Sequence, residues 1–356
     1  MRETDTSAPA LPSGEGRTRR LTRGRYRMKK FTRSKTFTLL LLFVFMILLF
    51  TALSGGRYLS AKNMKSILNG MVLVAFLAIG EAFLLILGYL DLSVGYLGTL
   101  SAFVCCMAIA HLNIPWWLAL IMAIVCGGLG GFLNACMVCK LNFQAFIATL
   151  AMSSICQGLT YIINGGRACQ LKSNEIIFLG SGTIGGFLPV GIVVALVFLI
   201  VYGVLLAKTK FGRSIYLCGG NAQAARLAGL NPQKYVFGMF INCGCLSAIS
   251  GLMYAARQKS IMVGGIANNQ FTGITAAILG GISFGGGSGN MFGCFLGLCI
   301  LNGFDVGMTV LGVASYVKTI FSGLLLIAAL LFDNFTTARA RKARLAATKA
   351  KTAADA

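Results

Sequence analysis

Charged residues are scarce in this chain of 356 residues, and acidic residues are the scarcest. Only 11% of the residues are charged, with nine Asp and Glu in all and a single histidine, His111. Soluble domains carry roughly 25% charged residues. The apolar runs hold neither a Ser/His/Asp arrangement nor a pair of carboxylates, so no enzymatic activity is expected of the chain itself.

Metal and nucleotide sites are also poorly supported. Most of the twelve cysteines lie within apolar runs, and the C-x-x-C pair of Cys136 and Cys139 has no second pair to complete a zinc site. The glycine-rich run at 285–289 lacks the Gly-Lys-Ser/Thr of a phosphate-binding loop, and we expect it to form a tight cytosolic turn. The sequence therefore predicts no metal and no cofactor.

Apolar sequence is abundant instead. Hydrophobic residues make up 57% of the chain, and apolar runs of the length that spans a bilayer as a helix, roughly 17–25 residues, recur along it. The sequence predicts an all-α polytopic membrane protein, with a transmembrane domain at 36–334 and an outside loop at 164–188. The expected spans, about ten, are 37–53, 67–87, 95–110, 115–139, 143–163, 190–207, 235–255, 271–284, 291–304 and 315–332.

The 31 Lys and Arg, which give a net charge of +22, are unevenly distributed. Eleven precede Thr36, six follow Asp333 and five lie at 208–234. Cytosolic loops of membrane proteins carry an excess of Lys and Arg. This distribution predicts cytosolic tails at 1–35, a disordered basic segment, and at 335–356. It indicates contact with the lipid membrane rather than with nucleic acid.

The loop at 208–234 is the longest polar interruption, with five cations and no carboxylate. It predicts a short helix of its own, because Asn221 is a good N-cap, Gly229 suits a left-handed C-terminal position, and Pro232 prevents continuation. A helix of about two turns is marginal alone in water. We therefore expect it to dock against a partner.

Four ionisable residues fall within or beside the expected spans: Glu81, Asp91, Asp305 and Lys318. A carboxylate at the middle of a bilayer costs about 2.5–3.5 kcal/mol on insertion scales. Asp91 is therefore a candidate for a functional residue. It could equally cap a broken helix, since Asp91 or Ser93 could satisfy free N–H groups where the next span begins, and the two roles are compatible.

Uncharged polar residues recur inside the spans, and glycines recur there at four-residue spacing, as between Gly127 and Gly131. The spacing predicts close contact between helices. The polar side chains would either hydrogen-bond between helices or line a polar path for a neutral polyol. The candidates for a translocation path are Asp91, Ser93, Asn134, Thr149, Gln157 and Asn164.

Four stretches together resemble one family. They are Leu90–Gly95 (LDLSVG), Phe146–Arg167, Phe211–Asn231 (FGRSIYLCGGNAQAARLAGLN) and Ala276–Gly293. From about residue 53 to 334 the chain resembles the permease subunits of the ABC importers for ribose, galactose, xylose and related simple sugars. Tyr89 stands where many relatives have glycine, which leaves the identity of the sugar open.

The resemblance implies a permease in a bacterial cytoplasmic membrane with both termini cytosolic. It implies three partners: a cytosolic ATP-binding subunit that hydrolyses ATP, an extracytoplasmic sugar-binding protein, and a second permease subunit in a homo- or heterodimer. The loop at 208–234 would then dock into the ATPase as a coupling helix. The residues that match the pattern of that loop, or lie on its helix, are Gly219, Gly220, Asn221, Ala225, Arg226 and Gly229.

Two other hypotheses remain. An ion-coupled secondary transporter would work without an ATPase and would use carboxylates inside the membrane. A membrane anchor that binds nucleic acid or lipid through its basic tails would explain the charge but would leave the polar residues of the spans without a role. The scarcity of acidic residues and the short cytosolic helix favour the importer permease.

Overall fold

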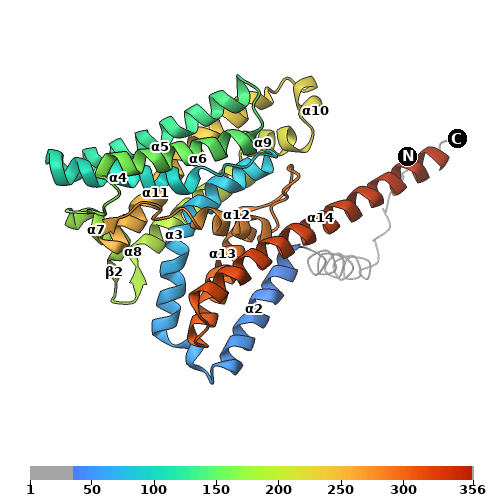
Figure 1. Cartoon of the computed structure of the whole chain (residues 1–356). Coiled ribbons are helices and arrows are strands. Elements are labelled where there is room, and N and C mark those ends of the chain that lie inside the picture. The colour runs from blue at the N-terminus through green and yellow to red at the C-terminus, as the bar shows by residue number, and fades with distance from the viewer. Residues whose placement is uncertain (1–34, 355–356) are drawn as a thin grey trace, which may run out of the picture.

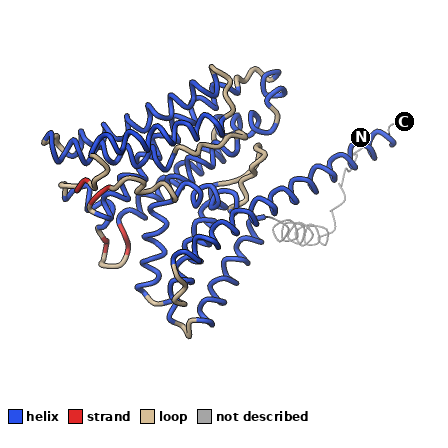
Figure 2. Tube along the Cα trace, in the orientation of Figure 1, coloured by secondary structure: helices blue, strands red, loops and turns tan. Residues whose placement is uncertain are grey.

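The computed structural model describes residues 35–354 and consists almost entirely of helices (Figures 1 and 2). The long helices are α2 (Lys35–Leu53), α3 (Ala61–Ile86), α4 (Val94–Leu112), α5 (Trp116–Cys139), α6 (Ala145–Asn164), α8 (Val190–Lys208), α11 (Pro232–Gln258), α13 (Met291–Val310) and α14 (Ser315–Ala354). The shorter ones are η1 (Arg57–Leu59), α7 (Asn174–Ser181), α9 (Lys210–Gly220), α10 (Ala222–Leu227) and α12 (Asn269–Leu279). Four two-residue strands complete it: β1 (Cys169–Gln170), β2 (Thr183–Ile184), β3 (Leu188–Pro189) and β4 (Ser260–Ile261).

Nine of the described helices are long and apolar enough to cross a membrane, which confirms the predicted all-α polytopic class. The span expected at 271–284 differs, because α12 has only 11 residues. At 1.5 Å per residue it is about 16 Å long, roughly half the thickness of the apolar layer. Gly281, with a φ of +87°, takes the chain out of the helix in a conformation that other residues rarely adopt.

The segment around α12 nevertheless runs from one end of the bundle to the other. Before it, β4 pairs with β1 beside the ends of α6 and α11. After it, the Gly287 amide donates to the Ile86 carbonyl at the end of α3 (2.7 Å), and the Tyr216 hydroxyl of α9 donates to the Gly289 carbonyl (2.6 Å). The chain therefore crosses the bundle here with only half of the crossing in a helix.

Helix α11 packs against α3, α4 and α5, and glycine permits the closest of these approaches. Gly127 on α5 and Gly244 on α11 face each other, and a Cβ on either would collide with the carbonyl oxygen of the other. A Cβ on Gly131 would likewise meet the Phe240 carbonyl. The prediction that this glycine pattern brings helix backbones together is confirmed here.

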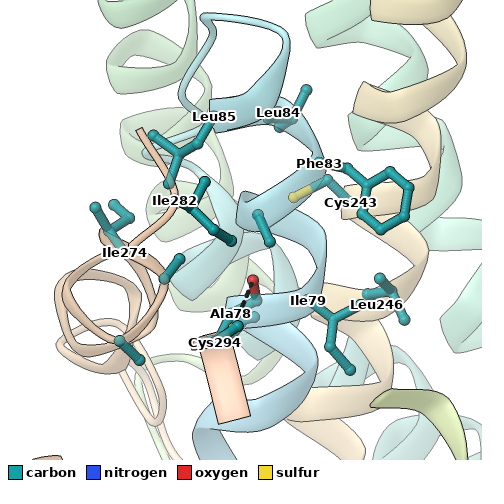
Figure 3. Close-up of a cluster of buried hydrophobic side chains, with 14 of the residues drawn as sticks. Ala78, Ile79, Phe83, Leu84, Leu85, Cys243, Leu246, Ile274, Ile282 and Cys294 are labelled. Atoms are coloured by element: carbon teal, nitrogen blue, oxygen red, sulfur yellow. Dashed lines mark hydrogen bonds between the residues drawn. The ribbon is translucent and has the colours of Figure 1, made fainter. Parts of the chain in front are cut away.

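Helix α3 is the most enclosed element: all its residues from Val74 to Ile86 are buried. A helix that is apolar on every side belongs in the interior, and α3 is surrounded by α8, α11, α12 and α13. Figure 3 shows part of this core, with Ile79 and Phe83 of α3 near Cys243 and Leu246 of α11. The interior of the protein therefore forms around α3.

Helices α2 and α14 lie at the edge of the bundle (Figure 1), and their apolar side chains are largely exposed. Exposed Leu and Phe on a membrane-spanning helix face lipid or another subunit. The predicted C-terminal tail at 335–356 continues α14 as far as Ala354. The predicted N-terminal tail at 1–35 lies outside the described residues except for Lys35.

The glycine contact can be tested with two matched substitutions on α11. Gly244→Ala inserts a methyl group against the α5 backbone, and we expect it to lower stability by about 1–3 kcal/mol, the usual cost of overpacking. Gly238→Ala meets no atom within 4 Å and should be neutral or slightly stabilising. Thermal unfolding of the purified protein measures both, and equal midpoints would contradict the assigned contact.

Candidate functional site

Asp91 lies where the chain leaves α3 and begins α4. Its Oδ1 accepts hydrogen bonds from the Ser93 amide (2.8 Å) and the Ser93 hydroxyl (2.6 Å). The Asp91 amide donates to Oε2 of Glu81, one turn from the end of α3 (3.4 Å). Because Glu81, Asp91 and Ser93 are fully buried, their side chains supply partners that the interrupted backbone needs. Asp91 therefore acts as a cap, as one of its two predicted roles requires.

Asn134 of α5 joins the same cluster from across the bundle. Its Nδ2 donates to Asp91 Oδ2 (3.1 Å) and to the Ser93 hydroxyl oxygen (2.8 Å). Asp91, Ser93, Asn134 and Glu81 all have no exposed surface. Three of the residues predicted for a translocation path thus meet in one buried cluster, which fastens α5 to the break between α3 and α4.

Two oxygen atoms of this cluster lack a hydrogen-bond partner among the described residues: Glu81 Oε1 and Asn134 Oδ1. Next to the break, Tyr89 and Leu90 line a cavity of about 480 Å³ with residues of the α5–α6 connection. The cluster is therefore both rigid and adjacent to an open space. Whether substrate passes it stays a prediction.

The other three predicted path residues lie apart from this cluster on α6. The Thr149 hydroxyl is buried and donates to the Ala145 carbonyl (2.8 Å), and Gln157 is half-buried two turns further on. Asn164 donates to the Arg167 carbonyl (3.1 Å) and closes the turn after the helix. From Thr149 to Asn164 is about 22 Å along the helix axis, so these side chains follow one helix rather than form one site.

At the end of the bundle where α3 ends, the polar loop forms two helices, α9 and α10. Asn221 caps α10, with Oδ1 accepting from the Gln223 and Ala224 amides, both at 3.0 Å. Gly229 is left-handed with a φ of +79°. Asn231 then caps α11, in which Pro232 is the first residue. The short helix predicted from these residues is confirmed.

Helix α9 was missed by the sequence analysis, although its buried residues Gly212, Ile215 and Cys218 follow one another at intervals of three. Apolar or small residues at intervals of three indicate one face of a helix, so this spacing could have predicted α9. Gly219 at its end lies so close to the Ile86 carbonyl that a Cβ would collide with it, and Gly220 lies against Gly287. The glycine-rich turn at 284–289 thus connects α9 with the end of α3.

The outer face of α10 is open. Ala225 is buried, whereas Arg226 is exposed and the Leu227 side chain is 92% exposed. The Arg226 side chain makes no hydrogen bond to a described residue, so both side chains are available for contact with another protein. The predicted coupling residues therefore lie in one continuous segment. Gly219 packs against the end of α3, and Arg226 faces away from the bundle.

The cluster can be tested by exchanging its partners. Asp91→Asn leaves buried donors without an anionic acceptor, and we expect a loss of about 1–3 kcal/mol in stability. Asn134→Asp in the same protein restores one carboxylate opposite one amide and should recover part of the loss. The control is Asp305→Asn, because that carboxylate is 60% exposed. Unfolding midpoints that do not differ among these variants would contradict a structural role for Asp91.

The chain was compared with known proteins. It is 32% identical over 273 residues to the L-arabinose transport system permease protein AraH of Escherichia coli K12, covering 77% of this chain and 83% of the relative. It is 29% identical over 299 residues to the ribose import permease protein RbsC of Haemophilus influenzae, covering 82% and 92%. The probable ABC transporter permease protein YphD of E. coli K12 is 28% identical over 340 residues, covering 95% and 99%.

No solved structure matches the chain. One family model matches residues 63–330, which run from the first turn of α3 into α14 and include the buried cluster and α9–α10. That model is described as the branched-chain amino acid transport system permease component. The chain therefore belongs to this family of membrane-spanning transport permeases.

Proposed function

We propose that the chain is the permease subunit of an ATP-driven importer for a simple sugar, a ribose-like pentose or a hexose. The similarity to permeases named for ribose and L-arabinose, over 77% or more of the chain, carries the proposal. The family description names branched-chain amino acids, but the individual relatives support a sugar. Most of the buried polar side chains in the described part of the chain are uncharged, which also suits a neutral substrate.

ATP hydrolysis belongs to a partner in this proposal. A cytosolic ATPase would bind the exposed face of α10, where the Arg226 and Leu227 side chains are exposed. The motion would reach the membrane through Gly219, because it lies against Ile86 at the end of α3. The turn that holds Gly287 lies against α9 and the end of α3, and it follows α12 in the chain. One displacement of α9 would therefore act both on the break after α3 and on the half-length helix α12.

Two further partners complete the importer. An extracytoplasmic sugar-binding protein would deliver substrate at the opposite end, where β1 pairs with β4 and α7 lies at the surface. A second permease subunit, identical or different, would cover part of the exposed apolar helix surface. The chain would lie in a bacterial cytoplasmic membrane with both termini in the cytosol, as the distribution of Lys and Arg favours.

The translocation path would pass the polar groups at the break before α4 and on α6. Asp91, Ser93 and Asn134 would line it at the break before α4. Thr149, Gln157 and Asn164 would line it along α6 towards the outside. Side-chain rearrangement during opening of the bundle would be needed to bring the three buried residues to the substrate, since they have no exposed surface in this state.

One observation favours a second function. Glu81 and Asp91 are both fully buried and lie within hydrogen-bonding reach through the Asp91 amide. Buried carboxylates inside a membrane are typical of carriers coupled to protons or Na⁺. In such an ion-coupled secondary transporter these residues would bind the ion and no ATPase would be required.

Reconstitution separates the two functions. The chain is co-expressed with candidate ATPase and sugar-binding partners, and ATP hydrolysis is measured in liposomes with and without sugar. The importer requires hydrolysis that sugar and binding protein stimulate. Sugar uptake by this chain alone, driven by an imposed proton or Na⁺ gradient, would instead establish the secondary transporter.

The docking surface gives a specific prediction. Arg226→Glu reverses a charge on an exposed face without touching the core, so we expect at least tenfold less co-purified ATPase at an unchanged unfolding midpoint. The matched control is Arg167→Glu, an exposed arginine at the opposite end of the bundle. Equal recovery of the ATPase with both variants would remove α10 from the interface.

A further inference from the structure

A second cavity, of about 520 Å³, lies between α3, α12, α13 and α14. Small-molecule sites in proteins occupy roughly 300–1,000 Å³. It reaches from Ser315, at the start of α14, down to Gly70 on α3 and Asn302 on α13. Gly70 is nine residues from the start of α3, so the cavity extends about 14 Å into the bundle from the end that carries η1 and the α13–α14 turn.

Polar groups on two facing helices are directed to this space. Asn302 donates from Nδ2 to the Leu298 carbonyl (2.9 Å), and its Oδ1 lies against Gly70, where a Cβ would come within 2.5 Å of it. On α12, Asn269 and Thr272 are half-buried, one turn apart, and their side chains bond to no other described residue. An amide and a hydroxyl with free capacity can donate and accept.

The charges at the cavity wall neutralise each other. Lys318 Nζ on α14 lies 3.5 Å from Asp305 Oδ1 on α13 and donates to the Thr309 hydroxyl (2.7 Å). The Lys318 side chain is only 18% exposed. A lysine engaged by two partners has little capacity left for the carboxylate of an amino acid, so the cavity offers hydrogen bonds without a free charge.

Two aromatic rings, those of Phe271 and Phe304, form the apolar part of the wall together with the aliphatic side chains of Leu73, Val74, Leu301, Met308, Leu325 and Leu326. Phe304 is held between Phe50, at 5.5 Å between ring centroids, and Phe321, at 6.0 Å. Phe271, on the same helix as Asn269 and Thr272, is 48% exposed. A monosaccharide has hydroxyl groups around its edge and C–H groups on its ring face. Amides, hydroxyls and an aromatic surface together match both parts.

We propose that this cavity is a monosaccharide-binding site, in which Asn302, Asn269 and Thr272 bind the hydroxyl groups and Phe271 packs against the ring. The inference rests on the proposed sugar import and adds to it the place where the permease holds its substrate. A lipid acyl chain would leave the Asn269 and Thr272 side chains without partners, which disfavours it as the occupant.

The test uses the full-length chain in lipid nanodiscs with a single reporter. Trp116 and Trp117, the two tryptophans of the chain, are replaced by Phe, and Phe271→Trp places a fluorophore in the cavity. D-ribose, L-arabinose, D-xylose, D-galactose and L-leucine are titrated separately. We expect a saturable change with at least one sugar and none with L-leucine. A control reporter, Phe178→Trp on α7, lies outside the cavity and should not respond.

Two substitutions then examine the polar contacts in the reporter protein. Asn302→Leu should raise the Kd for the sugar at least tenfold. Thr272→Val keeps nearly the same shape while removing one hydroxyl group, so it should raise the Kd about threefold without affecting folding. A threefold or greater loss with Thr272→Val, at an unchanged unfolding midpoint, excludes a general folding defect as the cause.

The remaining outcomes overturn the inference in different ways. If the assembled importer takes up a sugar to which the Phe271→Trp reporter does not respond, the cavity is not the site although the import function stands. A response to L-leucine alone would make it an amino acid site. A reporter signal that changes only with the phospholipid composition of the nanodisc would assign the cavity to lipid. If no sugar is taken up by the assembled importer, the proposed function itself fails.

Discussion

The approach of α11 to its neighbours is the contact on which the rest of the fold depends. It is possible because Gly127 and Gly244 meet backbone to backbone, with neither residue placing a side chain between α5 and α11. Association of helices in lipid is driven by close packing rather than by hydrophobic burial, so small residues replace the large ones of a soluble core. With α11 held in this way, α3 is enclosed, and the Asp91 side chain at the break is fully buried.

An enclosed break must satisfy its own polar groups, and this requirement explains the buried cluster. Asp91 and Ser93 hydrogen-bond to each other at the start of α4, and Asn134 reaches them from α5. The half-length α12 meets the same requirement differently, through strand pairing before it and the Gly287–Ile86 hydrogen bond after it. Interrupted backbone is tolerated at membrane depth only where protein surrounds it.

The sequence predicted features that depend on neighbouring residues and missed those that depend on distant ones. The cap at Asn221 and the left-handed Gly229 are local, and each is found as expected. The contact between Asn134 and Asp91 joins residues 43 apart, and no local pattern indicates it. The sequence analysis predicted one apolar span at 271–284, although the Gly280-Gly281 pair directly after Leu279 is a local sign that the helix ends there. The sequence could not show that Asn302 and Thr272, on different helices, line one cavity.

The contrast between Gly219 and the outer face of α10 has a consequence for evolutionary change. Gly219 has no room for any side chain, whereas the side chains of Gln223 and Leu227 are exposed. The two properties lie within one short segment, so the exposed face can vary while the buried attachment stays constant.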